Sequence, residues 1–214
     1  MRPTRPAPFD LSGGHPALDL VNTLDNRLSE APRDLLADYA DLLRFAEQAR
    51  LLDASRARSL GRSVSPEAAA RALGSARNLR EELAAVLYSR LGGRAAGPAD
   101  VLNLERHFQE ASRQRELGMS AQSEATGEGL LHWQWGRSVT AAEYPVWLLA
   151  VSAAELLLSG AAAHVRACGA ETCRWLFLDT SKNHTRRWCN MKVCGNRSKA
   201  RRFQERRSSR QASR

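Results

Sequence analysis

The segment Cys168-Gly-Ala-Glu-Thr-Cys173, followed fifteen residues later by Cys189-Asn-Met-Lys-Val-Cys194, decides the fold of the C-terminal part of this chain. These are all the cysteines of a 214-residue sequence. If the residues between the two C-x4-C pairs fold back as a hairpin, four thiolates meet. Zn²⁺ prefers a tetrahedral shell of soft ligands, and a closed four-thiolate shell is typical of a structural metal. We therefore expect one structural Zn²⁺ held by Cys168, Cys173, Cys189 and Cys194.

Two alternatives to this ligand set remain open at the level of sequence. Two disulfides could join the same cysteines, but the chain shows no signal peptide, and a cytoplasmic protein keeps its thiols reduced. His164 or His184 could replace one cysteine, although a lone histidine near such a site is more often a surface residue. The four-residue spacing is wider than in the common C-x2-C knuckle. Zinc in a cytoplasmic protein is the favoured interpretation.

At these cysteines the sequence resembles a known family. The stretches Cys173-Arg-Trp-Leu-Phe-Leu-Asp-Thr-Ser-Lys-Asn, Arg186-Arg-Trp-Cys and Cys194-Gly-Asn-Arg-Ser-Lys-Ala-Arg-Arg are similar to the CGNR zinc finger of bacterial proteins. The segment Gly13-Gly-His-Pro-Ala-Leu-Asp-Leu-Val-Asn-Thr-Leu-Asp25 is similar to the opening motif of the ABATE domain that precedes this finger. The resemblance implies a zinc-containing, nucleic-acid-binding protein and a role as a stress-linked transcription regulator.

Charge is distributed unevenly along the chain. Residues 164–214 carry 14 Lys and Arg against 3 Asp and Glu, whereas the other 163 residues carry 18 against 20. Genomic base composition can explain why arginine outnumbers lysine, but all three lysines, Lys182, Lys192 and Lys199, also fall in the finger. A basic region on a neutral body is typical of a nucleic-acid footprint. We expect nucleic acid, DNA first and RNA second, as the partner.

The residues before the finger predict a mainly helical domain. Apolar residues recur at helical spacing from Pro16 to about Asp25, from a cap at Asp34 to Leu52, from Ser65 to Gly92 with a break near Gly74, and from Pro98 to about Gln114. Period-two alternation in Leu131-His-Trp-Gln-Trp135 predicts a strand of a small antiparallel hairpin. The fold class is therefore α+β, with a mainly helical N-terminal domain, a small zinc-ribbon-like finger built on four cysteines, and a basic C-terminal helix.

The segment from Tyr144 to Leu158 is apolar on almost every side. A transmembrane span is the rival interpretation, since the apolar run approaches the minimum length. Glu155 and Ser152 argue against it, so we expect a core helix and no membrane partner. The expected organisation is a flexible arm over 1–12, an ABATE-like domain over 13–160, the finger and basic helix over 164–207, and a disordered basic tail over 208–214.

The finger and the helix after it hold the expected nucleic-acid contacts. Between the cysteine pairs, Trp175-Leu-Phe-Leu178 predicts a strand, and its aromatic residues, like Trp188, are expected to pack around the metal, with base stacking as the alternative. After Cys194, a helix beginning near Lys199 carries one carboxylate, Glu205, so its charge requires a polyanion or solvent. The residues expected to contact phosphates are Arg186, Arg187, Lys192, Arg197, Lys199, Arg201, Arg202 and Arg206.

Catalysis is not expected from this sequence. No zinc-hydrolase, deaminase, G-x-S-x-G or P-loop motif occurs, so we expect that the protein is not an enzyme. Asp19, Asn22 and Thr23 share a segment with an apolar face and could line a pocket for a small-molecule effector, or satisfy nearby backbone groups instead. The N-terminal domain is expected to sense or to dimerise. The alternatives are an RNA-binding protein and a protein-interaction module in which zinc only supports a docking surface.

Overall fold

The computed structural model describes residues 7–119 and 131–212, and the chain divides into two compact units. One unit combines Met1–Leu35 with Leu156–Arg214, and the other is Leu36–Glu155. Residues from both ends of the chain therefore belong to one body. In this division the first 35 residues group with the finger and not with the helices that follow them in the sequence.

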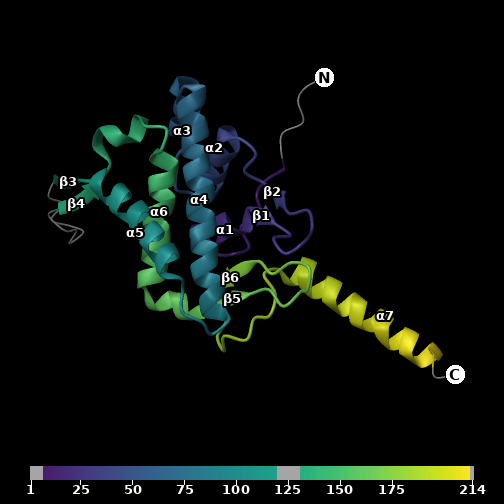
Figure 1. The fold of residues 1–214 in the computed structure, drawn as a ribbon. Coiled ribbons are helices and arrows are strands. Elements are labelled where there is room, and N and C mark those ends of the chain that lie inside the picture. The colour runs from purple at the N-terminus through teal and green to yellow at the C-terminus, as the bar shows by residue number, and fades with distance from the viewer. Residues whose placement is uncertain (1–6, 120–130, 213–214) are drawn as a thin grey trace, which may run out of the picture. The chain divides into compact units, whose positions relative to one another are not determined.

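The unit Leu36–Glu155 is helical, as expected, with one hairpin (Figure 1). Helix α5 packs against α4, and α2 packs against α3 and α4. Fully buried leucine and phenylalanine side chains, among them Leu42, Phe45, Leu79, Leu83 and Leu149, supply its core. Its elements are α2 (Tyr39–Gln48), α3 (Ala54–Ser63), α4 (Pro66–Leu91), α5 (Pro98–Arg113), β3 (Glu116–Met119), β4 (Leu131–Gln134), the 3-10 helix η1 (Gly136–Thr140) and α6 (Tyr144–Leu158), whose last residues belong to the other unit.

Local signals explain where these helices begin, with two corrections. Ser65 accepts a hydrogen bond from Ala68 N–H and caps α4, with proline at the first helical position, as expected. Asp34 was expected to cap α2, but the cap is Asp38, which accepts from Asp41 N–H at 2.8 Å. The expected break at Gly74 is also wrong, because α4 runs through it. An added Cβ at Gly74 would meet no atom within 4 Å, so no close neighbour requires a glycine at this position.

The predicted hairpin is confirmed. Strands β3 and β4 pair antiparallel, with Leu117 opposite Trp133 and Met119 opposite Leu131. Because side chains alternate across a strand, these four residues share one face, and each is more than half exposed.

No helix among the described residues is long and apolar enough to cross a membrane.

The other unit contains the cysteines and small β-elements. Strands β5 and β6 pair antiparallel, with Val165 opposite Leu178 and Ala167 opposite Leu176. The strand expected at Trp175–Leu178 is present as β6, but its partner is β5, which precedes Cys168, and not a return segment between the two cysteine pairs. Helix α7 was expected to end near Ser208 but continues to Ala212. Its elements are α1 (Pro16–Asn22), β1 (Leu24–Asp25), β2 (Arg33–Asp34), the 3-10 helix η2 (Gly160–His164), β5 (Val165–Ala167), β6 (Leu176–Leu178), the single π-turn η3 (Met191–Gly195) and α7 (Asn196–Ala212).

Candidate metal centre and nucleic-acid interface

The four cysteines meet at one point. Their Sγ atoms all lie within 4.8 Å of one another. Cys189 Sγ lies 3.6 Å from Cys173 Sγ and 3.7 Å from Cys194 Sγ. A tetrahedral ion with Zn–S bonds of about 2.3 Å places its sulfur atoms about 3.8 Å apart. The spacing of the thiols therefore fits one Zn²⁺, and four protein ligands leave no open coordination position.

Main-chain hydrogen bonds hold the two cysteine pairs together. Cys168 N–H donates to Trp175 O at 2.7 Å, which closes the loop between β5 and β6. Gly169 N–H donates to Arg187 O at 2.8 Å, so the first pair is also joined to the segment just before Cys189. At the second pair, Cys194 N–H donates to Asn190 O at 2.9 Å. Cys168, Cys189 and Cys194 are buried, whereas Cys173 is half-buried. One edge of the cluster is therefore accessible.

The thiols influence one another strongly. Hydrogen bonds from Cys173 and Cys189 lower the pKa of Cys168 to about 2, and donating to Cys168 raises the pKa of Cys189. Burial raises the pKa of Cys194. The raised pKa values mean that these thiols hold protons when no cation is bound. Zinc binding must displace those protons, so zinc affinity falls with decreasing pH.

Aromatic residues surround the cluster, as the sequence predicted. Phe177 is fully buried with Cys168, Cys189 and Cys194, and the half-buried Trp175 and Trp188 pack against this group. The two candidate histidines lie together instead of joining the ligand set, since the rings of His164 and His184 stack with their centroids 3.9 Å apart. Within the described residues, the metal-binding group consists of the four cysteines.

The N-terminal segment is hydrogen-bonded to the finger. Asn22 Nδ2 donates to Leu176 O at 2.8 Å, and Leu176 N–H donates to Asn22 Oδ1 at 2.8 Å, so one side chain satisfies both main-chain groups of a strand residue. Leu178 N–H donates to Gly13 O at 2.8 Å. Trp175 Nε1 donates to Asp25 Oδ1 at 3.0 Å. The motif that opens the chain thus completes the edge of the finger hairpin.

Asp19, Asn22 and Thr23, the expected pocket residues, are buried and hydrogen-bonded within this unit. Asp19 Oδ1 accepts from Gly13 N–H at 2.8 Å, and Thr23 Oγ1 donates to Leu20 O at 2.6 Å. Burial raises the pKa of Asp19 to about 7, against the lowering effect of the Gly13 hydrogen bond. A cavity next to Cys173, Cys189 and Cys194 is lined by other residues and not by these three. Their observed partners are protein groups.

Arg186 has a role that its sequence neighbourhood did not indicate. Its guanidinium donates to the carbonyls of Trp188 (2.9 Å) and Ser12 (3.1 Å) and also contacts that of Cys189. The same group lies over the Phe177 ring, 4.5 Å from the centroid. Because main-chain carbonyls take up its donors, Arg186 joins the N-terminal segment to the second cysteine pair.

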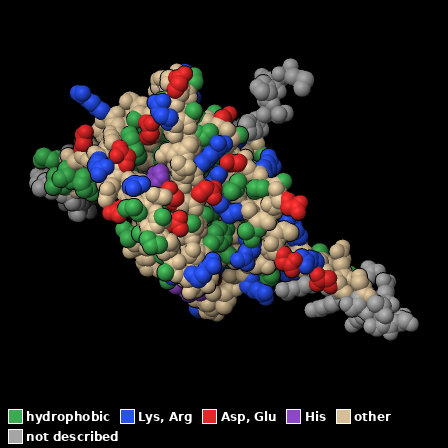
Figure 2. Space-filling model, viewed as in Figure 1, with side chains coloured by type: hydrophobic (Ala, Val, Ile, Leu, Met, Phe, Trp, Pro, Cys, Tyr) green, Lys and Arg blue, Asp and Glu red, His purple; other side chains and the backbone are tan. Residues whose placement is uncertain are grey.

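The other residues expected to contact phosphates differ in whether they form ion pairs within the protein. Arg187 and three residues near the start of α7, Lys192, Arg197 and Lys199, are exposed, and none forms an ion pair within the described part of the chain. Arg201 pairs with Glu171 and Glu205. Figure 2 shows acidic and basic side chains together where α7 begins. The side chains of Arg202 and Arg206 lie outside the described residues.

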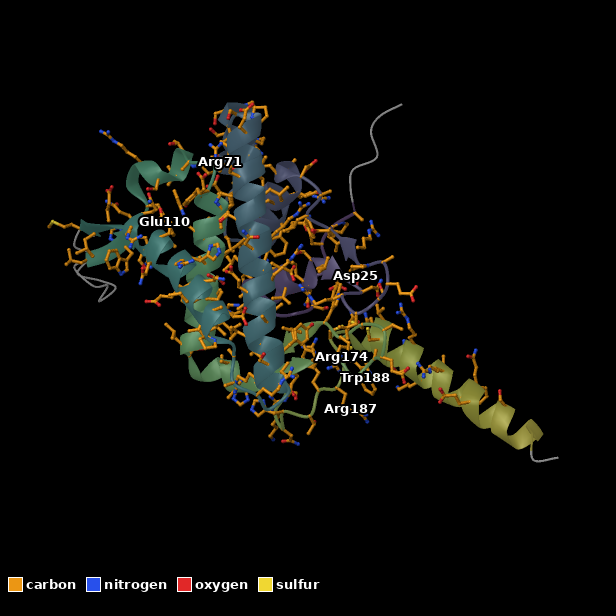
Figure 3. All side chains as sticks on the ribbon, in the orientation of Figure 1. Asp25, Arg71, Glu110, Arg174, Arg187 and Trp188 are labelled. Atoms are coloured by element: carbon orange, nitrogen blue, oxygen red, sulfur yellow. The ribbon has the colours of Figure 1, made fainter. Side chains whose placement is uncertain are left out.

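Arg187 lies on the segment between the two cysteine pairs, next to an aromatic residue. Arg187 lies over the Trp188 ring, with its guanidinium carbon 5.4 Å from the centroid. Figure 3 labels both residues, together with Arg174, on the segment between the cysteine pairs. The finger and the first turn of α7 therefore carry a group of exposed cations, to which Arg174 and Lys182 also belong.

Two family models match the sequence over nearly its whole length. The CGNR zinc finger matches residues 164–207, and ABATE, described as a putative stress-induced transcription regulator, matches residues 14–160. The chain belongs to the ABATE family. Its CGNR finger is the four-cysteine site described above, consistent with one structural Zn²⁺. A comparison with curated proteins finds no match.

The ABATE match and the compact units divide this chain differently. The match spans residues 14–160 and includes α1 through α6. In the structure, α1 packs against β6 of the CGNR finger. The opening motif of the ABATE sequence therefore contributes to the body that holds the metal centre.

Proposed function

We propose that this ABATE–CGNR protein is a cytoplasmic, DNA-binding transcription regulator in which the finger and basic helix contact the phosphate backbone. The observation that carries the proposal is a group of four cations in the finger and at the start of α7 that are exposed and form no ion pair with a described carboxylate: Arg187, Lys192, Arg197 and Lys199. Lysine and arginine that neutralise phosphates release condensed counterions, so such a surface binds a polyanion most strongly at low salt. The family description supports a role in transcription.

The proposed interface is narrower than charge alone suggested. Arg186 is left out, because its donors face main-chain carbonyls. A phosphate that approaches Arg201 must compete with Glu171 and Glu205, although exposed ion pairs of this kind are weak. Arg202 and Arg206 stay in the proposal on the charge of the sequence.

Duplex DNA binding at two salt concentrations tests this function. The four exposed cations alone predict a log–log salt slope of about −3.6, and Arg202 and Arg206 would add about −1.8. Replacing Arg187, Lys192 and Lys199 together by Gln should weaken binding and make the slope shallower by about 2.7, with zinc content unchanged. The matched control replaces three exposed arginines of α3 and α4, Arg58, Arg62 and Arg71, by Gln and should bind as the wild type does.

The same titrations separate the alternatives. A stronger affinity for single-stranded or structured RNA than for the duplex, with the same dependence on the three cations, would replace DNA by RNA as the partner. Equal binding by the triple variant and the wild type would contradict the proposed interface and favour a zinc-supported protein-interaction module.

We also propose that the N-terminal domain, residues 13–160, mediates homodimerisation as well as sensing. The supporting observation is the apolar face of the β3–β4 hairpin, where Leu117, Met119, Leu131 and Trp133 are exposed. A second copy that packs its own hairpin against this face would bury these four side chains. Light scattering should give a dimer for the wild type and a monomer for Trp133→Ser. A monomeric wild type at high concentration would contradict the proposal.

We propose finally that the protein is not an enzyme. Four thiolates complete the coordination shell of the metal, so the ion offers no position for a substrate or an activated water. Zinc-dependent hydrolysis of ester, amide or phosphodiester model substrates by the purified protein would contradict this proposal.

A further inference from the structure

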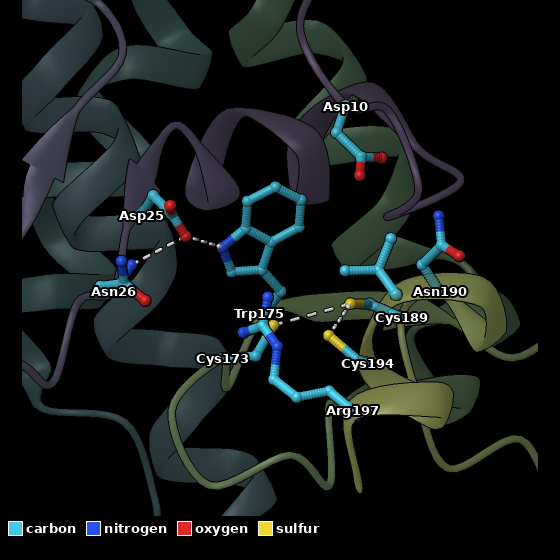
Figure 4. A pocket seen from close by; sticks show the side chains of 10 residues that line it. Asp10, Asp25, Asn26, Cys173, Trp175, Cys189, Asn190, Cys194 and Arg197 are labelled. Atoms are coloured by element: carbon cyan, nitrogen blue, oxygen red, sulfur yellow. Dashed lines mark hydrogen bonds between the residues drawn. The ribbon is translucent and has the colours of Figure 1, made fainter. Parts of the chain in front are cut away.

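A cavity of about 220 Å³ lies between the N-terminal segment and the cysteine cluster, within one compact unit (Figure 4). It is small compared with pockets for drug-sized ligands, which span about 300–1,000 Å³. One side belongs to the N-terminal segment and the other to the finger. Its lining consists of Asp10, Asp25, Asn26, Cys173, Trp175, Cys189, Asn190, Val193, Cys194 and Arg197.

The charges of this cavity differ from those of the proposed nucleic-acid surface. Asp10 and Asp25 are carboxylates, and a zinc ion with four thiolates carries a net charge of about −2. Among the described residues, Arg197 is the one cationic side chain in the lining, and the proposed nucleic-acid surface includes it as well. A phosphate group inside the cavity would meet three negative centres, so nucleic acid is disfavoured there. A ligand with a cationic end is favoured.

Two features of the lining suit an ammonium group. Asp25 accepts hydrogen bonds from Trp175 Nε1 at 3.0 Å and from Asn26 N–H at 2.9 Å, both at Oδ1. Oδ2 therefore remains to accept from a ligand. The first of these bonds fixes the indole ring of Trp175, which forms part of the wall. An indole face attracts an ammonium ion.

The cavity also offers a partner for an anionic group on the same ligand. Arg197 is exposed and forms no ion pair among the described residues. A guanidinium binds a carboxylate through two parallel hydrogen bonds. The cavity thus presents carboxylates and an indole for a cation and one guanidinium for an anion, in a volume that suits few atoms.

We propose that this cavity binds a free α-amino acid or a zwitterionic amine of similar size. The ammonium group lies by Asp10, Asp25 and Trp175, and the carboxylate group lies by Arg197. The ligand then bridges the N-terminal segment and the finger. This assignment does not depend on nucleic-acid binding and can be tested without it.

The test uses the zinc-loaded full-length protein, isothermal titration calorimetry and thermal unfolding. Each of the standard amino acids is added separately at about 10 mM, high enough to detect millimolar binding. Ethanolamine, which lacks a carboxylate, and acetate, which lacks an ammonium group, are the matched fragments, and guanosine monophosphate represents nucleic-acid building blocks. At least one amino acid should bind and raise the unfolding temperature, and each fragment should bind at least about tenfold more weakly.

Variants assign the binding to this cavity. Arg197→Gln and Asp25→Asn should each weaken it by about tenfold to a hundredfold, since each removes a charge-assisted hydrogen bond. Asp10→Asn is a second test of the carboxylate side that leaves the Trp175–Asp25 bond intact. Arg187→Gln makes the same charge change outside the lining and should bind as the wild type does. Zinc content, measured for every variant, shows that the finger is still folded.

Three results would overturn the assignment. The first is that no amino acid binds at the highest concentration. The second is that binding survives in both Arg197→Gln and Asp25→Asn. The third is that guanosine monophosphate, rather than an amino acid, binds and depends on these residues.

Discussion

Replacing Asn22 by Ala should destabilise the metal-binding unit more than any change of an exposed polar residue. The Asn22 side chain is 3% exposed, and its amide pairs with the main-chain N–H and C=O of Leu176, which is fully buried. Alanine removes the amide donor and acceptor, so the buried N–H and C=O of Leu176 lose their hydrogen bonds to residue 22. Each such group costs about 1–3 kcal/mol, so the expected loss is about 2–6 kcal/mol of unfolding free energy.

The affinity for zinc should also fall when Asn22 is replaced by Ala. Folding of a small finger and metal binding are coupled, so a loss of about 2 kcal/mol or more in the folded finger weakens zinc binding by at least about thirtyfold. The assays are urea unfolding of the zinc-loaded protein and competition with a chromophoric chelator. Asn22→Asp keeps the shape but places an oxygen against Leu176 O, so it should cost at least as much.

Asn183→Ala provides the control. Asn183 is an exposed residue of the finger loop, and its replacement should change the unfolding free energy by no more than about 0.5 kcal/mol. If Asn22→Ala lay within the same range, the hydrogen bonds between the N-terminal segment and β6 would not contribute to the fold. The grouping of the first 35 residues with the finger would then be refuted.

Four further outcomes are expected. Gly13→Ala should cost about 1–3 kcal/mol of unfolding free energy in thermal denaturation, because a Cβ there would lie 2.5 Å from Asp19 Oδ1. The raised pKa of Asp19 means that the folded unit keeps a proton that the unfolded chain loses near pH 4, so its stabilising effect is present below that pH and is lost as the pH rises to about 7. Asp19→Asn should remove this decline, and equal slopes of stability against pH in both proteins would count against it. Cys173→Ser should reduce zinc, measured by metal analysis, below half an equivalent per chain, since about 10 kcal/mol of apparent folding energy depends on the ion. A fragment of residues 36–160 should unfold cooperatively at the same temperature as one of residues 1–160, and a molten shorter fragment would show that residues 1–35 belong to the helical core instead.

Several features of this protein could be predicted from local sequence. The four cysteines predicted the metal centre, because ligand type and spacing specify a tetrahedral thiolate site. The helices α2, α4 and α5, the strand pair around Trp133 and the strand at Leu176 followed from hydrophobic periodicity, which is a property of neighbouring residues. The matching family models confirm the resemblance that the CGNR and ABATE motifs carried.

Other features depend on contacts that no local pattern encodes. Asn22 and Leu176 are 154 positions apart, and periodicity cannot reveal that one amide satisfies both main-chain groups of the other residue. Arg186 was indistinguishable from Arg187 by charge, yet one faces main-chain carbonyls and the other faces solvent. Asp25 ended a motif without an evident role until folding placed it against Trp175. The sequence by itself determined the metal, most of the helices and the net charge, whereas tertiary structure decided which polar groups are internal, because a hydrogen-bond partner is chosen by proximity in space.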